Sequence, residues 1–356
     1  MKSGSHLVFV TPGFARDEQD STCTPYLQSF FLALKAARPD LRLTIIAMQY
    51  PYFRGKYKWH GLDVIAVGGK NRRLRKPMVW RRTRRAIVKL HRRQPIDVVH
   101  SFWLTEATNV AAKACKRLGI KHVASCMGQD VLPTNAYLKK LPFGRMHLIA
   151  LSAFNAGLMK QHVGREADAV IPFGLADGDV DYNASSNRPI DLLAVGSLVP
   201  VKRYDRFLRV VKMASEVYPG LRAMLIGDGE GRKQLERQAA EFGLEGILEF
   251  AGQMSRDKVL KMMSSSKVFV HTSDMEGTGL VLVEALGRGM HVVTSPVGVG
   301  GELMEGPAAD KCAVSMATFT LHEAAVAFLN QPVDWQPRLP YPMDRCVAEH
   351  LVVYAR

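Results

Sequence analysis

The chain has 356 residues, which is long for one compact domain and suits two, and its hydrophobic content of 47% allows both to bury a core. No apolar stretch approaches the about 20 residues that cross a bilayer, and the opening strand-like run is too short for a secretory signal, so the sequence predicts neither. The net charge of +15 is concentrated in one segment and indicates an anionic partner. The five cysteines lack zinc-site spacing, so we expect reduced thiols in a cytosolic protein: Cys23, Cys115, Cys126, Cys312 and Cys346.

The first half alternates short β-like runs with helix-compatible segments. The runs are rich in Val, Ile and Leu with little polar alternation, as is typical of parallel strands covered on both faces. The expected strands are His6–Thr11, Leu41–Met48, Leu62–Val67, Asp97–Phe102, His122–Cys126, His147–Leu151 and Ala169–Pro172. The expected helices are Tyr26–Ala37, Met78–Arg92, Glu106–Leu118 and Ala153–Gln161. This alternation predicts a doubly wound sheet with right-handed crossovers.

One segment, 70–93, has twelve Lys or Arg in its twenty-four residues and no acid. Such a segment binds anions or forms a solvated helix face, and both interpretations stay open here. Cations alternate with Met78, Val79, Trp80, Ile87, Val88 and Leu90, as in helices that lie at a membrane interface. The candidate membrane or anion patch consists of Arg72, Arg73, Arg75, Lys76, Trp80, Arg81, Arg82, Arg84 and Arg85.

The alternation breaks at 174–189, a polar stretch with no hydrophobic period that we interpret as a hinge linker. It restarts in the second half, with strands expected at Ile190–Gly196, Leu221–Ile226, Ile247–Phe250, Val268–Thr272 and His291–Thr294. Two such domains predict a ligand cleft between the carboxyl ends of facing sheets.

The strongest local pattern follows the expected strand that ends at Thr272. Gly277-Thr-Gly279 turns the chain and a helix begins near Leu280, so free backbone N–H groups and the helix dipole suit a phosphate there. Glu276 precedes the turn and Glu284 lies one turn into the helix, which allows one to face a sugar and the other a ribose. A generic βα turn with a solvent glutamate is the alternative.

A second pattern begins the C-terminal half, where an expected strand ends at Gly196 and a short loop leads to Lys202. A lysine beside this sheet edge can neutralise a diphosphate leaving group without a metal, although a surface lysine has the same local sequence.

Gly196…Lys202 followed about eighty residues later by Glu276-Gly-x-Gly-Leu…Glu284 resembles the retaining family 4 glycosyltransferases (glycosyl transferases group 1) of the GT-B fold. The likeness is nearly continuous from Asp191 to about Leu303. It is looser in the first half, where Thr11-Pro-Gly-Phe14, Asp97-Val-Val-His100, Gly128-Gln-Asp130, Leu151-Ser152 and Ile171-Pro-Phe-Gly174 carry it.

The resemblance implies an α/β fold of two Rossmann-like domains facing across a cleft. The acceptor domain would be 1–173, the linker 174–189, the nucleotide-sugar domain 190–340, and a helix in 341–356 would cross back to the first domain. Acceptor contacts would come from the loops Arg16–Thr24 and Gly55–His60.

The resemblance also implies roles for single residues. Glu284 would bind the donor ribose, Glu276 would lie by the donor sugar and Lys202 would contact the diphosphate. The candidate catalytic residues are Glu276, Lys202, His100 and Asp130. The candidate donor-binding residues are Gly13, Gly196, Ser197, Lys202, Arg203, Gly252, Gln253, Glu276, Gly277, Thr278, Gly279, Leu280, Val281 and Glu284. His100 would touch an acceptor from a strand end, or else be a satisfied core histidine.

Three positions depart from the family pattern. Ser197 stands where many relatives carry an arginine, a deficit that Arg203 would fill. Thr278 replaces the usual aromatic residue, and Met127 replaces a histidine before the Gly-x-Asp element. Asp177-Gly-Asp179 spells a metal signature of another glycosyltransferase fold, but it lies in the expected linker and we interpret it as chance.

We therefore expect an enzyme that moves a hexose, with retention and without metal or cofactor, from a UDP or GDP sugar to a glycan or lipid-linked acceptor. It would be cytoplasmic and peripheral on the inner membrane face. Nucleic acid is not expected as a partner, because no binding module is recognisable. The alternatives are a nucleotide-sugar epimerase, or a non-catalytic protein that binds anionic lipid on a degenerate transferase scaffold.

Overall fold

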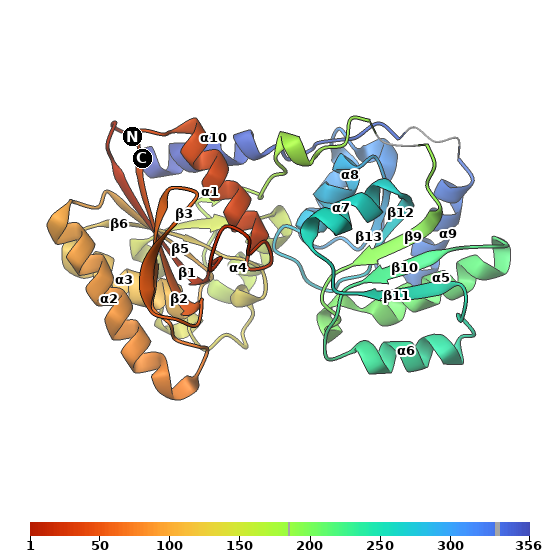
Figure 1. Cartoon of the computed structure of the whole chain (residues 1–356), viewed down its shortest axis with the longest axis horizontal. Coiled ribbons are helices and arrows are strands. Elements are labelled where there is room, and N and C mark those ends of the chain that lie inside the picture. The colour runs from red at the N-terminus through yellow and green to blue at the C-terminus, as the bar shows by residue number, and fades with distance from the viewer. Residues whose placement is uncertain (184–185, 332–334) are drawn as a thin grey trace. The chain divides into compact units, whose positions relative to one another are not determined.

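The computed structural model of the chain describes residues 1–183, 186–331 and 335–356. Its contacts divide it into two compact units, each with its own sheet (Figure 1). Unit 1 comprises Met1–Phe173 and Met343–Arg356, and unit 2 comprises Gly174–Pro342. The stretch expected to be a linker, 174–189, is grouped with unit 2, and its residues Ala184 and Ser185 lie outside the described part.

Unit 1 contains an eight-stranded sheet in the order β3-β4-β2-β1-β5-β6-β7-β8, parallel throughout except for the pair β3 and β4. Its strands are β1 (His6–Gly13), β2 (Arg42–Tyr50), β3 (Gly55–Trp59), β4 (Leu62–Ala66), β5 (Val98–Phe102), β6 (Lys121–Ser125), β7 (His147–Ala150) and β8 (Ala169–Val170). Its helices are α1 (Pro25–Ala37), α2 (Lys76–Arg93), α3 (Glu106–Leu118), α4 (Ala153–Val163) and α10 (Met343–Ala355).

Strand β1 explains why helices cover both faces of this sheet. Leu7 and Phe9 face a core formed with α1 and α10, whereas Val8 and Val10 face a second core formed with α2 and α3. Side chains alternate between faces along a strand, so a run of consecutive apolar residues needs cover on both sides.

Helix α2 buries only a narrow stripe. Val79, Thr83 and Ile87, spaced four residues apart, are fully covered, and the remaining faces carry the cations of the basic segment. A spacing of four places these residues on one side of a helix, so α2 packs on the unit along one line and leaves its charges outside.

The segment Gly55–His60, expected to be a loop, is largely the edge strand β3. Its residues alternate between exposed lysines (Lys56, Lys58) and more buried aromatic residues (Tyr57, Trp59), which is the period of a strand half-covered on one face. Lysines on an edge strand also discourage pairing with another chain.

Unit 2 contains a six-stranded, fully parallel sheet in the order β11-β10-β9-β12-β13-β14. Its strands are β9 (Ile190–Val195), β10 (Ala223–Ile226), β11 (Leu248–Gly252), β12 (Ser266–His271), β13 (His291–Thr294) and β14 (Cys312–Val314). Its helices are α5 (Tyr204–Val217), α6 (Arg232–Glu241), α7 (Arg256–Ser264), α8 (Leu280–Gly287) and α9 (Thr318–Leu329). Because every strand is parallel, all six carboxyl ends lie along one edge of the sheet.

Candidate functional site

Three adjacent strands of unit 2 end in glycines that bring their backbones together. Gly196 follows β9 at φ +150°, Gly227 follows β10 at +144°, and Gly252 ends β11 at +71°. The amide of Gly196 donates to Ile226 and that of Gly227 donates to Gly252, both at 2.9 Å. A Cβ on Gly227 would lie 1.9 Å from the carbonyl oxygen of Gly196, so no side chain fits there. This edge therefore offers backbone rather than side chains to a ligand.

Lys202 and Glu276, from the loops after β9 and β12, meet at the same edge. Lys202 Nζ lies 2.5 Å from Glu276 Oε1, and the same oxygen accepts a hydrogen bond of 3.0 Å from His271 Nε2. The ring of His271 is fixed from its other side, where Nδ1 lies 2.9 Å from Thr294 Oγ1. Burial alone would raise the pKa of Glu276, but the hydrogen bond from His271 and the charge of Lys202 lower it to about 2.

Helix α8 begins directly after this glutamate. Gly279 precedes it at φ +80°, and no side chain caps its first turn. The preceding Gly277-Thr278 stretch is held close to Gly298, because the amide of Val299 donates to the Thr278 carbonyl at 2.8 Å. The amides of Leu280 and Val281, at the positive end of the helix dipole, thus follow Glu276 by only four and five residues.

Glu284, within α8, belongs to a cluster of three charged residues. Arg256 Nε donates to Glu284 Oε1 at 2.9 Å, and the two terminal nitrogens of the same guanidinium bind both oxygens of Asp179 at 2.9 Å. Burial raises the pKa of Glu284, and the nearby Arg256 works against that rise. Asp179 comes from the Asp177-Gly-Asp179 sequence, whose match to a metal signature we interpreted as chance. The structure shows a different role for this carboxylate, which pairs with Arg256, the partner of the candidate ribose carboxylate.

Other predicted donor residues lie at the same edge with different surroundings. Ser197 and Gln253 are exposed. Arg203, expected to fill the deficit left by Ser197, instead directs its guanidinium to Asp205 at 2.9 Å and to Asp274 at 3.1 Å. These two ion pairs occupy the guanidinium of Arg203, and its compensation for Ser197 stays a prediction.

The candidate residues of unit 1 form a separate set. Gly13 ends β1 and, with Tyr50 and Glu106, lines a pocket of about 400 Å³ at the carboxyl edge of that sheet. Asp130 is 6% exposed and accepts hydrogen bonds from the amides of Met127 and Leu104, which fixes the loop after β6. Burial raises the pKa of Asp130 to about 6.

We expected His100 at the end of a strand. It lies instead in the middle of β5, where its side chain is 1% exposed. Its Nδ1 is 2.7 Å from Tyr354 Oη and its Nε2 is 2.8 Å from Ser125 Oγ. Burial holds its pKa well below the usual range. These contacts agree with the core-histidine interpretation and leave no ring nitrogen for an acceptor.

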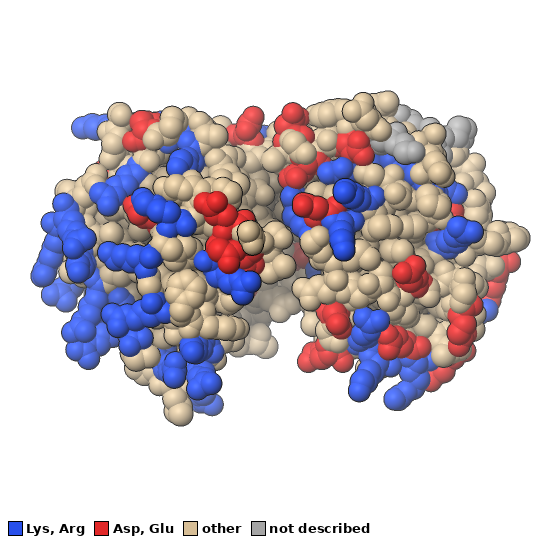
Figure 2. Space-filling model, viewed as in Figure 1, with Lys and Arg blue, Asp and Glu red and all other residues tan. Residues whose placement is uncertain are grey.

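The basic segment gathers over α2, in the blue area at the left of Figure 2. Arg72, Arg73, Arg81, Arg84 and Arg85 are exposed, and Arg75, Lys76 and Arg82 are half-buried. The apolar residues that we placed at a membrane interface behave differently. Val79 and Ile87 are fully buried, and Trp80 donates its indole N–H to Glu106 at 2.9 Å, so these three stabilise the unit instead.

Four residues that contact Glu276, Glu284 or their partners in unit 2 were absent from the predicted site: His271, Thr294, Arg256 and Asp179. His271 lies at the end of β12, within the part of the sequence that resembles the family. Its position beside Glu276 could therefore have been predicted from the sequence. The sequence around Arg256 holds no signal, because its partners are 77 and 28 residues away.

Within the described residues, no helix is both long and apolar enough to cross a membrane. The same part of the chain contains no group of three His, Cys, Asp or Glu side chains arranged to hold a metal ion.

Comparison with known proteins relates this edge to one family. Residues 180–306 match the model of glycosyl transferases group 1. An uncharacterised glycosyltransferase of Methanocaldococcus jannaschii is 26% identical over 59% of this chain and 58% of its own length. The gpi3 subunit of phosphatidylinositol N-acetylglucosaminyltransferase from Schizosaccharomyces pombe is 27% identical over 33% of this chain and 26% of its own length. The chain thus spans between about a quarter and three fifths of the length of these two relatives.

Two solved structures cover nearly the whole chain. Sucrose-phosphate synthase of Thermosynechococcus elongatus has a TM-score of 0.79 at 16% identity, over 99% of this chain and 98% of its own. HepE of Anabaena, solved in complex with UDP, has a TM-score of 0.65 at 18% identity, over 98% of this chain and all of its own. The predicted fold class, two doubly wound α/β units of the GT-B type, is confirmed.

Proposed function

Because residues 180–306 match the model of glycosyl transferases group 1, we propose that the chain transfers a hexose from a nucleotide diphosphate sugar to a hydroxyl group. The observation that carries this proposal is the pairing of Lys202 with Glu276 at the glycine-lined strand ends, directly before the uncapped helix α8. A diphosphate needs cations and amide donors, and both are present at this edge.

In the proposed reaction the bond between the sugar C1 and the donor phosphate oxygen breaks while the acceptor oxygen bonds to C1 on the same face. The acceptor proton passes to the departing phosphate oxygen, and bond formation on the face that the phosphate leaves retains the anomeric configuration. Lys202 has three N–H donors, so it can hold the departing diphosphate while it keeps its contact with Glu276. Glu276 stays ionised at neutral pH, as its lowered pKa requires, and orients the sugar.

Glu284 is proposed to bind the two ribose hydroxyls. Its Oε1 accepts from Arg256, which leaves Oε2 to accept from the ribose. The donor base is proposed to lie near Gly252 and Gln253. A UDP sugar is our first choice, because HepE was solved with UDP, and a GDP sugar is the second.

The acceptor is proposed to be a glycan or a lipid-linked glycan at the inner membrane face, with the reaction independent of metal. The relative that acts on phosphatidylinositol and the exposed cations of α2 support a lipid-linked acceptor. Epimerisation would consume no acceptor, so product analysis separates it from transfer.

The test is thermal unfolding with a panel of nucleotide diphosphates and their sugars, repeated with Glu284→Ala. A ligand that binds only the folded chain at a hundred times its Kd stabilises it by about 2.7 kcal/mol, which raises the Tm by about 5 to 10 °C. We expect this shift with one nucleotide, and its loss in Glu284→Ala.

The control variant is Glu245→Ala, because Glu245 is exposed and precedes the amino end of β11, at the opposite edge of the sheet. It should keep the full shift. If no nucleotide at millimolar concentration shifts the Tm, the donor site is wrong and the degenerate-scaffold alternative stands.

A further inference from the structure

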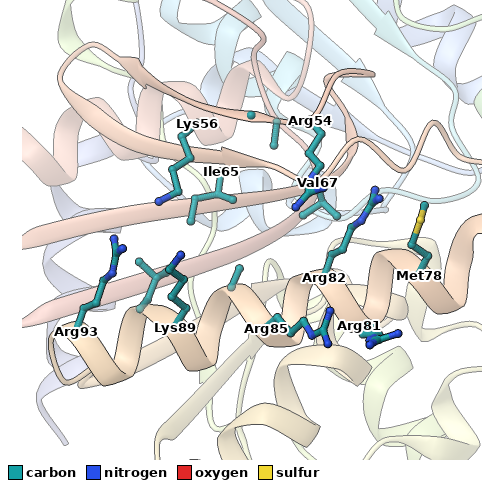
Figure 3. Close-up of a pocket in the computed structure, with 14 residues that line it drawn as sticks. Arg54, Lys56, Ile65, Val67, Met78, Arg81, Arg82, Arg85, Lys89 and Arg93 are labelled. Atoms are coloured by element: carbon teal, nitrogen blue, oxygen red, sulfur yellow. The ribbon is translucent and has the colours of Figure 1, made fainter.

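Unit 1 contains a groove that the proposed transfer does not use. It lies between α2 and the hairpin of β3 and β4, and it has a volume of about 790 Å³ (Figure 3). Its apolar lining comes from both elements and includes Ile65, Val67, Met78, Ala86 and Leu90.

In the part of the chain that the structure describes, the groove is lined by seven cations and by no acid: Arg54, Lys56, Arg81, Arg82, Arg85, Lys89 and Arg93. Figure 3 shows Lys56 and Arg54 on the hairpin side and Arg82, Arg85, Lys89 and Arg93 along α2. Among the described residues, no salt bridge involves any of the seven, whereas Lys58, which does not line the groove, pairs with Asp63 at 2.9 Å. Uncompensated cations around a confined apolar surface attract a negatively charged partner.

The lining also restricts what that partner is. No aromatic side chain from the described ranges 1–183, 186–331 and 335–356 lines the groove, so these residues offer no platform on which nucleic acid bases would stack. The apolar floor gives nothing to an inorganic anion, but it suits a hydrocarbon chain. Large apolar side chains are exposed beside the groove in sequence: Tyr52 and Phe53 precede Arg54, and Leu74, at 96% exposed, precedes α2.

We propose that this groove binds a membrane phospholipid, with the lipid phosphate on the cations of α2 and β3 and the start of a hydrocarbon chain on Ile65, Met78 and Leu90. Unit 1 would then rest on an anionic bilayer through α2, with Leu74 and Phe53 entering the interface. This inference deepens the proposed membrane association, but it does not depend on sugar transfer.

The experiment measures binding of the full chain to phosphatidylcholine vesicles with and without phosphatidylglycerol, without nucleotide. The groove variant Lys56→Gln/Arg82→Gln is compared with the flank variant Arg84→Gln/Lys113→Gln. Arg84 and Lys113 line a different depression, between α2 and α3, so both variants lose one Lys and one Arg.

A cation engaged at a lipid surface contributes about fivefold in affinity. We expect the affinity for anionic vesicles to fall at least about twentyfold in the groove variant, relative to the unchanged chain. In the flank variant it should fall by less than about fivefold. Equal losses in the two variants would show a diffuse helix-face attraction and overturn the groove. Equal binding of neutral and anionic vesicles would overturn the recognition of charge.

The variant Ala86→Trp tests the apolar part, because it fills the groove and changes no charge. It should weaken vesicle binding at least fivefold with an unchanged melting temperature, whereas unchanged binding would contradict a hydrocarbon chain in the groove. If Ala86→Trp unfolds, Met78→Gln, at the partly exposed end of the groove, replaces it with the same expectation.

Competition identifies the source of the phosphate. Short-chain dihexanoyl phosphatidylglycerol should release the chain from vesicles, and inorganic phosphate at the same ionic strength should not. Equal release by inorganic phosphate would mean a free-anion site and would overturn the lipid. Because no step uses a nucleotide, failure here leaves the Tm shift by a donor nucleotide intact, and failure of that shift leaves this result intact.

Discussion

Glu276 is ionised because two neighbours favour the charged form in a place where burial opposes it. Its pKa falls from 4.5 to about 2 through His271 and Lys202. A carboxyl whose pKa is lower in the folded than in the unfolded chain stabilises the fold above the unfolded pKa, and that stabilisation disappears as the pH falls toward the folded value.

We therefore expect unit 2 to lose on the order of 3 kcal/mol of stability from this one group between pH 5 and pH 2. The measurement is urea unfolding across that range for the unchanged chain and for Glu276→Gln, which has no such titration. The difference between the two curves should shrink as the pH falls. Curves that stay parallel down to pH 2 would show that the Glu276 contacts do not stabilise the folded state.

Arg256 fixes one oxygen of the candidate ribose carboxylate, Glu284. Its guanidinium holds Glu284 Oε1 and is itself fixed by both oxygens of Asp179. Burial raises the pKa of Glu284, so the loss of this cation should raise it further. A protonated carboxyl accepts ribose hydroxyls poorly.

For Arg256→Gln we expect nucleotide binding to weaken about tenfold or more at pH 6 and by less at pH 8, because a higher pH favours the ionised form of Glu284. Calorimetric titration at both pH values measures this. A purely structural role would weaken binding equally at both values. The control is Arg237→Gln on the exposed face of α6, which should bind as the unchanged chain does.

At the level of whole elements, residue patterns were reliable wherever burial repeats along the chain. The expected helix Glu106–Leu118 is α3 over the same residues, and the expected strand His291–Thr294 is β13. Pattern reading failed at β3, because a five-residue edge strand carrying two lysines resembles a loop. It also misassigned Trp80 and Ile87, since the sequence shows that apolar residues share α2 with cations but not which side faces the sheet.

Helix α10 completes the core of unit 1. It buries Met343, Cys346, Val347, His350, Val353 and Tyr354. The Tyr354 hydroxyl contacts His100, and its ring packs on Phe9 with centroids 6.4 Å apart. The helix is therefore part of the first unit although the chain reaches it last.

Tyr354→Ala should lower the free energy of unfolding by about 3 to 5 kcal/mol, because it removes a buried aromatic ring and leaves Nδ1 of the buried His100 without its hydrogen-bond partner. Val352→Ala, on the same helix at 52% exposed, should change it by less than about 0.5 kcal/mol. Denaturant unfolding of both variants gives the comparison. Similar losses would mean that α10 does not pack as described.

At the scale of the whole molecule, the charge is divided unequally. Unit 1 has 31 Lys and Arg against 12 Asp and Glu, a net charge of +19, whereas unit 2 has 17 against 21, a net charge of −4. The sequence located this positive excess in one segment, because composition alone is enough to show it. It could not show the groove beside α2, because Arg54 and Lys56 reach it from a hairpin that the sequence did not predict.

The candidate site also has one part that the sequence could predict and one part that it could not. Lys202 and Glu276 follow strand ends of one parallel sheet, so their meeting was predictable from topology. The Asp179–Arg256–Glu284 cluster joins three segments far apart in sequence, and only the packing of α7 and α8 against 177–179 brings them together.

The division of unit 1 into Met1–Phe173 and Met343–Arg356 has a consequence for the order of synthesis. A ribosome releases the first 173 residues, then all of unit 2, and only afterwards the helix that covers α1. Unit 2 can fold as it emerges, whereas unit 1 must wait with Phe30 and Phe31 lacking their final cover. The unit that begins to be translated first can thus complete its core only after all of unit 2 has been made.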